Sequence, residues 1–201
     1  MIKITAGRQC ILSGGLMVGL SFLFIPFQAL SVATVTVQGT LVAGGCDVSL
    51  EGGGGVKMDD ALASDFDVVQ TASIQPFQMI INNCSNVKMG HSYSVSVAGQ
   101  LLSGSNDVFN DDPTADLGFM LKTNGKGPVN DWSGTKAVFY NAAGTVQPDK
   151  PTQTDTFSED DPLSIRLNYV VGLVALKSGT GAVNPSPRKV KATLTFNVNY
   201  Q

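Results

Sequence analysis

The 201-residue sequence contains one histidine and one tryptophan, and this scarcity argues against most enzyme and metal-site chemistry. Nucleophilic catalysis needs a base beside the nucleophile, and zinc sites need clustered histidine or cysteine ligands. His91 stands alone beside Gly90, where a strand is expected to start, so we interpret it as a surface loop residue. Trp132, within NDWSG, could stack on a sugar, although a partly buried loop anchor is the simpler interpretation. We expect no bound metal and no cofactor.

Other catalytic and ligand-binding signatures are also missing. Acidic residues gather at 59–60, 111–112 and 159–161, in loops that lack the spacing of a calcium-binding loop. Solvated turns therefore explain them better than calcium binding or glycoside hydrolysis does. The glycine run 52–55 is not followed by Gly-Lys-Ser/Thr, so it does not form a phosphate-binding loop. We predict a protein that is not an enzyme and has no small-molecule substrate.

Basic residues are fewer than acidic ones, 13 against 16, which gives a formal net charge of −3. Two of the basic residues, Lys3 and Arg8, lie in an N-terminal segment that we expect to be removed. The remaining chain would carry 11 basic and 16 acidic residues, a net charge of −5. An acidic surface argues against binding to nucleic acid or to anionic membranes.

The N-terminal segment has the order of a secretory signal peptide: basic residues, an apolar run over 11–27, then small residues. We expect cleavage between Ala29 and Ala33, with the bond after Ser31 preferred, which assigns residues 1–31 to the signal. A membrane anchor is the less favoured alternative, because the run is short and interrupted by glycine and proline. No second apolar run is long enough to span a bilayer.

Only three cysteines are present, and Cys10 would leave with the signal peptide. Two cysteines in an exported chain indicate one disulfide, so we predict a bond between Cys46 and Cys84. Two free buried thiols are the alternative. Closing the 38-residue loop between them would contribute roughly 4 kcal/mol if the bond acts by restricting the unfolded chain.

The rest of the chain has a β pattern, with weak helical periodicity and no internal repeat. Short alternating segments separated by turn residues are typical of an antiparallel sandwich. The segments expected to contain strands are 34–50, 76–81, 91–99, 117–123, 136–142, 163–176 and 190–200. Residues 103–116 and 142–162 are expected to form long polar connections, and 63–70 a helical turn.

The last segment, VKATLTFNVNYQ, has the most regular alternation in the chain. Its apolar positions share one face of an extended strand: Val190, Ala192, Leu194, Phe196, Val198 and Tyr200. An exposed edge strand of this composition would promote aggregation, so a partner strand is expected beside it. No later segment follows to supply that partner.

The other end of the exported chain offers a complementary strand, in which Val35, Val37, Gly39 and Leu41 share one face. Glycine inside a strand marks a bulge or a close backbone approach. If this strand pairs with the last strand of another molecule, the contact is heterologous and builds an open fibre. Pairing of residues 34–42 within their own domain is the alternative.

Four motifs, TVTVQGTLVAGGC, PFQMIINNC, LSIRLNYVV and VKATLTFNVNYQ, occur in this order after the signal peptide. Together they resemble the subunits of chaperone–usher pili, the type 1 fimbrial pilins, over almost the whole exported chain. The turn at 178–189 and the connection at 142–162 are longer than is usual in the family. The resemblance implies an all-β fold, an incomplete immunoglobulin-like β-sandwich that lacks its last strand.

The resemblance also implies the parts and partners of the subunit. Residues 32–42 would be an N-terminal donor strand, and residues 43–201 the pilin domain. The groove that accepts a strand, first from a periplasmic chaperone and then from another pilin at the outer-membrane usher, would be lined by Leu194, Phe196, Val198, Tyr200 and Gln201. The expected location is a surface fimbria that supports adhesion of the bacterium, reached through the periplasm. A self-complete secreted β-sandwich that binds carbohydrate is the alternative, and a secreted hydrolase is less favoured.

Overall fold

A computed structural model of the chain describes residues 29–30, 33–41, 46–84, 90–126, 134–157, 164–184 and 186–200. Most of the predicted signal peptide lies outside the described residues, as do its preferred cleavage position, Trp132, the acidic run 159–161 and Gln201. No helix within the described ranges is long and apolar enough to cross a membrane.

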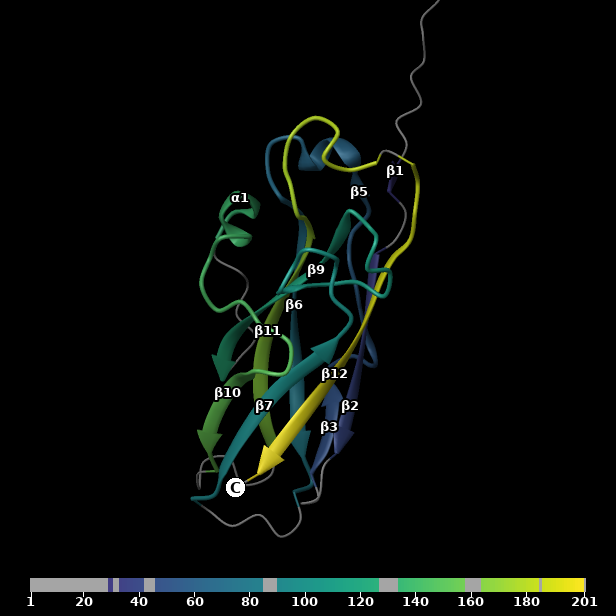
Figure 1. The fold of residues 1–201 in the computed structure, drawn as a ribbon. Coiled ribbons are helices and arrows are strands. Elements are labelled where there is room, and N and C mark those ends of the chain that lie inside the picture. Colours follow the sequence, from purple (N-terminus) through teal and green to yellow (C-terminus); the bar gives the residue numbers. More distant parts are fainter. Residues whose placement is uncertain are drawn as a thin grey trace, which may run out of the picture.

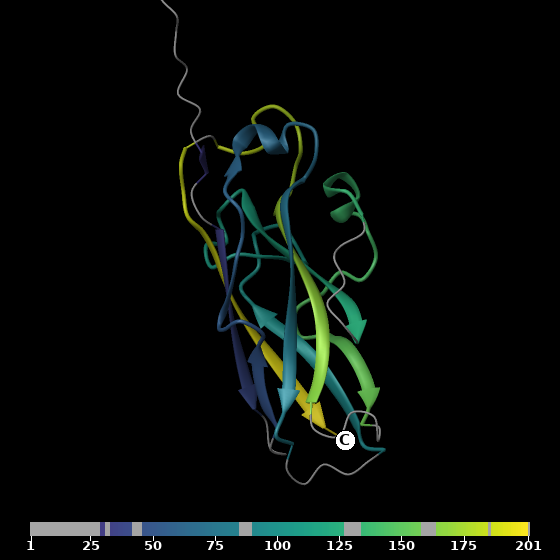
Figure 2. The same ribbon diagram turned by 180° about the vertical axis from the view of Figure 1, so that it is seen from behind.

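Two five-stranded sheets form the body of the molecule (Figures 1 and 2). The first, here called the β11 sheet, has the order β3 (Asp47–Leu50), β6 (Thr71–Asn82), β11 (Ser164–Ala175), β9 (Leu117–Lys126) and β8 (Val108–Phe109). The second, the β12 sheet, has the order β10 (Pro151–Thr156), β7 (Ser92–Gly99), β12 (Val190–Tyr200), β2 (Ala33–Leu41) and β4 (Gly55–Lys57). Two short strands, β1 (Ala29–Leu30) and β5 (Ala61–Leu62), pair separately.

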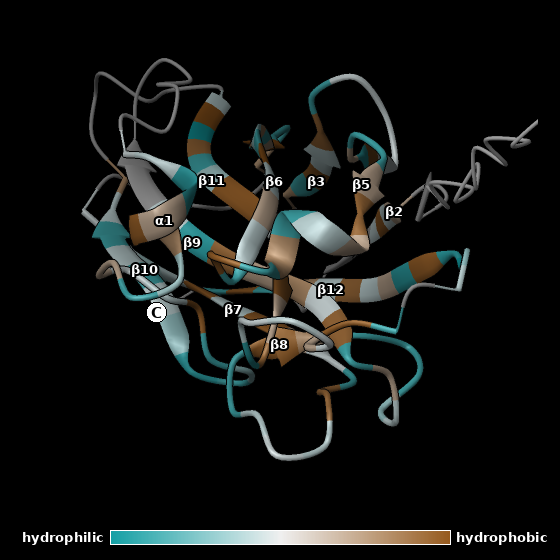
Figure 3. Cartoon of the chain, turned by 90° about the horizontal axis from the view of Figure 1, so that it is seen from above, coloured by the Kyte–Doolittle hydropathy of each residue, from teal (hydrophilic) through white to brown (hydrophobic). Residues whose placement is uncertain are grey.

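Apolar side chains from the two sheets meet between them and form the main core. Phe77 of β6 stacks on Tyr169 of β11, with ring centroids 5.5 Å apart. Phe196 of β12 meets Tyr169 edge-on at 5.2 Å, so an aromatic cluster joins the sheets. Coloured by hydropathy in Figure 3, β11 and β12 carry both hydrophobic and hydrophilic bands, as alternating strands should. The predicted sandwich and the inward face of the last strand are confirmed.

Strand β11 is buried on both faces over most of its length, because a second apolar cluster covers its outer face. Phe139 lies over Gly172, and a Cβ atom at Gly172 would come within 2.3 Å of the phenyl ring. Phe139 belongs to helix α1 (Lys136–Phe139), which lies outside the β11 sheet (Figure 1). The prediction of a strand over 136–142 is therefore wrong. The segment is held on the sheet by the single buried side chain of Phe139, and not by an alternating row of apolar residues.

Two further predictions concern the connections. The polar stretch 142–162 contains β10, which pairs with β7 at the edge of the β12 sheet, so it is not wholly a loop. Side-chain hydrogen bonds help to hold β10 in place of apolar packing. The hydroxyl of Thr152 donates to the carbonyl of Val95 and lies 3.0 Å from the hydroxyl of Tyr169. Similarly, 103–116 contains the two-residue strand β8. The helical turn expected at 63–70 is confirmed as the 3-10 helix Ala63–Phe66.

Candidate strand-acceptor site

Strand β12 lies between two partners in the middle of its sheet (Figure 1). It pairs antiparallel with β7, from Leu194 opposite Gly99 to Tyr200 opposite Tyr93. On its other edge it pairs parallel with β2, the only parallel pairing among the described strands. The strand expected beside the last strand is therefore present, and it comes from the N-terminal end of the same chain.

The register sets the predicted donor positions against the predicted acceptor positions. Val35 lies opposite Ala192, Val37 opposite Leu194, Gly39 opposite Phe196, and Leu41 opposite Val198. The glycine position thus lies opposite an aromatic residue of the acceptor strand. Within this single chain the pairing is intramolecular, which is the arrangement stated above as the alternative for residues 34–42. Exchange between molecules stays a prediction.

The apolar face of β12 is buried from Val190 to Val198. Leu194, Phe196 and Val198 are each 0% exposed, and Lys191 on the opposite face is exposed. Val35 of β2 is also 0% exposed. Strand β2 therefore completes the core beside β12 and does not merely lie on the surface.

The outer edge of β2 has much less support than its inner edge. Antiparallel pairing with β4 covers only residues 34–36, and the amide of Met58 adds one bond to the carbonyl of Ala33. Beyond Thr36, no described strand pairs with this edge of β2. Detaching β2 would therefore break its ladder to β12 and a short ladder to β4, but no strand pairing of the β11 sheet.

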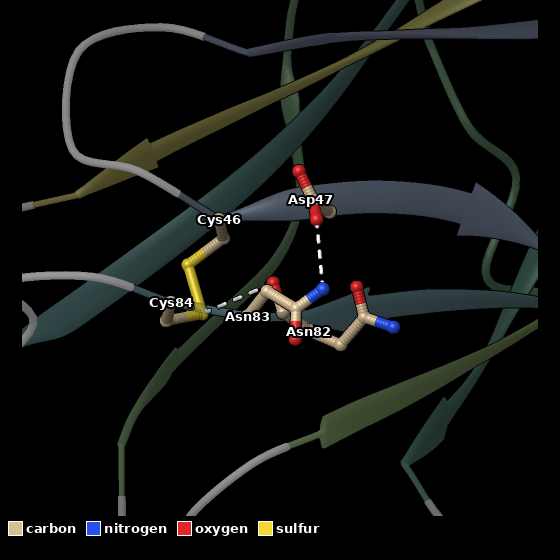
Figure 4. The surroundings of a disulfide bond; sticks show 5 residues. All are labelled: Cys46, Asp47, Asn82, Asn83 and Cys84. Carbon is tan, nitrogen blue, oxygen red and sulfur yellow. Dashed lines mark hydrogen bonds between the residues drawn. A yellow bond between two sulfur atoms is a disulfide. The ribbon is translucent and has the colours of Figure 1, made fainter.

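The predicted disulfide between Cys46 and Cys84 is confirmed, and it marks the point where β2 joins the rest of the fold (Figure 4). Cys46 precedes β3, and Cys84 follows β6, which pairs with β3 in the β11 sheet. The amide of Asn83 donates to the carboxylate of Asp47 at 2.8 Å, next to the bond. The disulfide holds the start of β3 on β6, so β2 is attached to a fixed base.

Sequence reasoning missed one residue of this site, Asp111, which it treated as part of a solvated turn. Its carboxylate accepts hydrogen bonds from the backbone and the hydroxyl of Thr193 and pairs with Lys191, both on β12. Burial would raise the pKa of Asp111, but the bonds from Thr193 and the charge of Lys191 outweigh it and lower the pKa below 3.8. No local signal could have identified this role, because Thr193 lies 82 residues away in the sequence.

The fold and site define a class of protein: a β-sandwich whose second sheet is completed by a strand from the N-terminal end. A family model described as fimbrial protein matches residues 35–201, so the chain belongs to the fimbrial protein family. Among curated proteins, no sequence matches the chain significantly.

Two solved structures are similar to this chain. One is a structure of a chaperone–usher pilus concerned with rod uncoiling; it has a TM-score of 0.54 at 14% identity and covers 100% of both chains. The other is the crystal structure of the P pilus rod subunit PapA, with a TM-score of 0.47 at 16% identity, covering 69% of this chain and 85% of that one. At these identities the likeness concerns the fold.

Membership of the family establishes the general role. The chain is a structural subunit of a surface fimbria, and other fimbrial subunits are its partners. The resemblance seen in the four sequence motifs is confirmed, and the alternative of a self-complete carbohydrate-binding module is not favoured.

Proposed function

We propose that this subunit polymerises by donor-strand exchange, in which β2 of one molecule occupies the place beside β12 of the next. The observation that carries the proposal is the pairing of β2 with β12, because β2 has only a short ladder to β4 as its other strand pairing. Exchange of one element between identical chains forms the same contacts between molecules as within one. Because the contact is head-to-tail, repetition produces an open fibre.

We expect a filled groove to be lower in free energy than an empty one. The free energy should differ little between a strand from the same chain and a strand from a neighbour. Burial of a donor side chain such as Val35, which is 0% exposed, stabilises the filled groove by about 1.5–3 kcal/mol, and the backbone bonds of the ladder to β12 add to this. The conformational entropy lost when the segment is ordered opposes the gain. An empty groove would expose the apolar face of β12, so we expect the subunit to be either closed on its own strand or joined to a neighbour.

A subunit whose groove must stay filled needs a temporary partner during export. We propose that a periplasmic chaperone lends a strand to β12, along Leu194, Phe196, Val198 and Tyr200, and holds the carboxylate of Gln201 with basic side chains. At an outer-membrane usher, the donor strand of the next subunit then replaces the chaperone's strand. This sequence of partners is a known form of strand addition to an exposed sheet edge.

The proposal divides the chain into a signal peptide over 1–31, a donor extension over 32–42 and a pilin domain over 43–201. A mature chain that begins at Val32 retains the whole of β2, which starts at Ala33. Mass spectrometry of the exported chain tests this division. A mature start beyond Val35 would remove a buried donor residue and contradict it.

Two matched substitutions in β2 test strand exchange. Val35→Asp places a charge on the buried face, whereas Thr34→Asp places the same charge on the other face, where the side chain is only partly buried. We expect Val35→Asp to be exported with its disulfide formed but to give no fibres, and Thr34→Asp to give normal fibres. Electron microscopy of the cell surface measures fibres, and a non-reducing immunoblot measures export. Normal fibres from Val35→Asp would rule out β2 as the donor.

A further inference from the structure

Strand β12 extends beyond β7 at its beginning. The ladder with β7 starts at Leu194, which lies opposite Gly99, whereas the ladder with β2 starts at Val190. Residues 190–193 therefore have β2 as their only described strand partner. If β2 leaves, these residues lose their only described strand ladder. Keeping an unpaired segment extended costs conformational entropy.

The loop after β8 takes the place of β7 along this part of β12. The backbone N–H of Asp111 donates to the carbonyl of Lys191 at 2.8 Å. One carboxylate oxygen accepts the backbone N–H of Thr193 at 2.7 Å, and the other accepts its hydroxyl at 2.9 Å. The ammonium of Lys191 lies 3.2 Å from the same carboxylate. Asp111 thus supplies both a donor and an acceptor to the edge of β12, as a residue in a neighbouring strand would.

The position of Asp111 does not depend on β2. The preceding Asn110 is only 4% exposed, and its side-chain amide donates to the carbonyl of Leu117 at 2.6 Å. Its backbone N–H donates to the carbonyl of Gln100 at 2.9 Å, and its side-chain oxygen accepts the backbone N–H of Asp112 at 2.8 Å. These bonds tie the loop to β9 and to the end of β7 and involve no residue of β2, so we expect Asp111 to stay in place when the groove is empty.

The segment that leads into β12 is held in the same region. The guanidinium of Arg188 makes two bonds to the carboxylate of Asp116, at 2.6 and 3.1 Å. It also donates to the carbonyl of Asn184 at 2.6 Å. Two-point pairs of this kind restrict orientation as well as distance. The chain therefore reaches Val190 along a fixed path.

We propose that Asp111 is a positioning residue for strand exchange, which keeps residues 190–193 extended and in register while the groove is empty. An incoming strand then meets an edge that is already ordered. The conformational entropy of residues 190–193 has been lost before binding, so it does not reduce the free energy of binding. This inference rests on the proposed function. It adds that the groove has a preformed end, at which pairing with Ala33 and Thr34 of the donor begins.

Uptake of a donor peptide by a full-length chain tests the role of Asp111. The chain carries Val35→Asp, so that its own β2 no longer fills the groove, and the probe is a fluorescent peptide of residues 33–41. Stopped-flow anisotropy gives the association and dissociation rate constants. We expect Asp111→Ala to lower the association rate about tenfold and to change dissociation by less than about twofold, because the lost order precedes binding. A role confined to holding the complex together would instead raise the dissociation rate.

Two further variants separate positioning from general damage to the fold. Asp111→Asn keeps an oxygen for the N–H of Thr193 but loses the charge, so we expect an association rate only about two- to threefold below that of the Val35→Asp chain. Asp112→Ala removes the neighbouring carboxylate, whose bonds among the described residues go to Thr114 in its own loop, and should leave both rates unchanged. A cooperative urea denaturation transition confirms that each variant is folded.

The outcomes distinguish this inference from the function on which it rests. If the Val35→Asp chain takes up no peptide, donor-strand exchange fails and the role of Asp111 fails with it. If the peptide binds and Asp111→Ala leaves the association rate within about twofold, only the positioning role is overturned. Should Asp111→Ala not fold, an Asp111→Asn association rate equal to that of the Val35→Asp chain overturns it equally.

Discussion

The two sheets of this subunit are built from similar strands but differ in what holds them together. In the β11 sheet every pairing is antiparallel, the disulfide fixes β3 beside β6, and both faces of β11 are covered. In the β12 sheet the position between β12 and β4 is filled by β2, which pairs parallel with β12. Under the proposed exchange, the β11 sheet would be a permanent part of the subunit and β2 would be the replaceable strand of the β12 sheet.

This difference shows how one domain can be stable and still be ready to assemble. A strand can be exchanged without unfolding only if the rest of the core persists when it leaves. The aromatic cluster of Phe77, Tyr169 and Phe196 joins the sheets at β12 and not at β2, so we expect the junction between the sheets to persist when β2 leaves. Strand β2 contributes apolar burial beside that junction, which any donor with the same alternation can supply.

The largest effect is expected where the two sheets meet. Phe196→Asp places a charge at a fully buried position that contacts Phe77 and Tyr169, and we expect a loss of more than about 4 kcal/mol, enough to prevent folding. Asn197→Asp, on the other face of β12, should cost less than about 1 kcal/mol. The yield of oxidised soluble protein and urea denaturation measure both variants. A stable Phe196→Asp chain would show that β12 does not join the sheets.

Removing the disulfide should weaken the permanent sheet. For Cys46→Ser with Cys84→Ser we expect the free energy of unfolding to fall by about 4 kcal/mol, because a 38-residue loop is released in the unfolded chain. Reduction of the unchanged protein by dithiothreitol should give the same loss and serves as the control. Urea denaturation measures both. An equal denaturation midpoint with and without the bond would contradict the expected anchoring role.

A smaller effect is expected on the outer face of the β11 sheet. Gly172→Ala would place its Cβ 2.3 Å from the ring of Phe139, and we expect a loss of about 1–3 kcal/mol as α1 is displaced. Gly54→Ala, at a site with no atom within 4 Å of the added Cβ, is the control. Hydrogen exchange should show loosening at α1 while the β12–β2 ladder is unchanged. Loosening of β2 instead would show that the sheets are not independent.

The smallest effect concerns Lys122 of β9, which is 1% exposed and donates to the hydroxyl of Thr145 and the carbonyl of Ala142. Burial lowers the pKa of Lys122 below 10.5, against an opposing effect of Asp107. Below the lowered pKa both states carry the proton, so Lys122 adds no pH dependence. Between that pKa and 10.5 the unfolded chain binds more protons, and the contribution of Lys122 to stability rises with pH.

Lys122→Met should remove this rise, and the exposed Lys136→Met should not. Urea denaturation at intervals from pH 7 to pH 10.5 gives the two curves, and the difference between variant and unchanged chain isolates Lys122 from tyrosines that titrate in the same range. Identical curves would contradict burial of the ammonium in the β11 sheet.

Much of the fold could be predicted from local pattern alone. Period-two alternation predicted β12, β7 and β2, and the cysteine count predicted the disulfide, because these signals lie in neighbouring residues or in chemistry that needs no contact map. Helix α1 was missed because four residues are too few to show a helical period. Strand β10 was missed because it is a polar edge strand without apolar alternation.

The residues of the exchange site divide in the same way. Leu194, Phe196 and Val198 could be predicted because their burial follows from the alternation of their own strand. The role of Asp111 could not, because it depends on two bonds to Thr193 that only the folded loop creates. Val35 was predicted as a donor from the alternation of its own strand. That pattern cannot distinguish pairing with β12 of the same chain from pairing with β12 of another molecule.

By itself the sequence determined that the chain forms alternating strands, that one disulfide closes, and which face of the last strand is apolar. Only the tertiary structure decided that β2 lies parallel to β12 in the same chain and that Asp111 holds the beginning of β12. The physical reason is that alternation specifies which face of a strand is buried, whereas the partner at its edge is chosen by backbone hydrogen bonds that any extended segment can make.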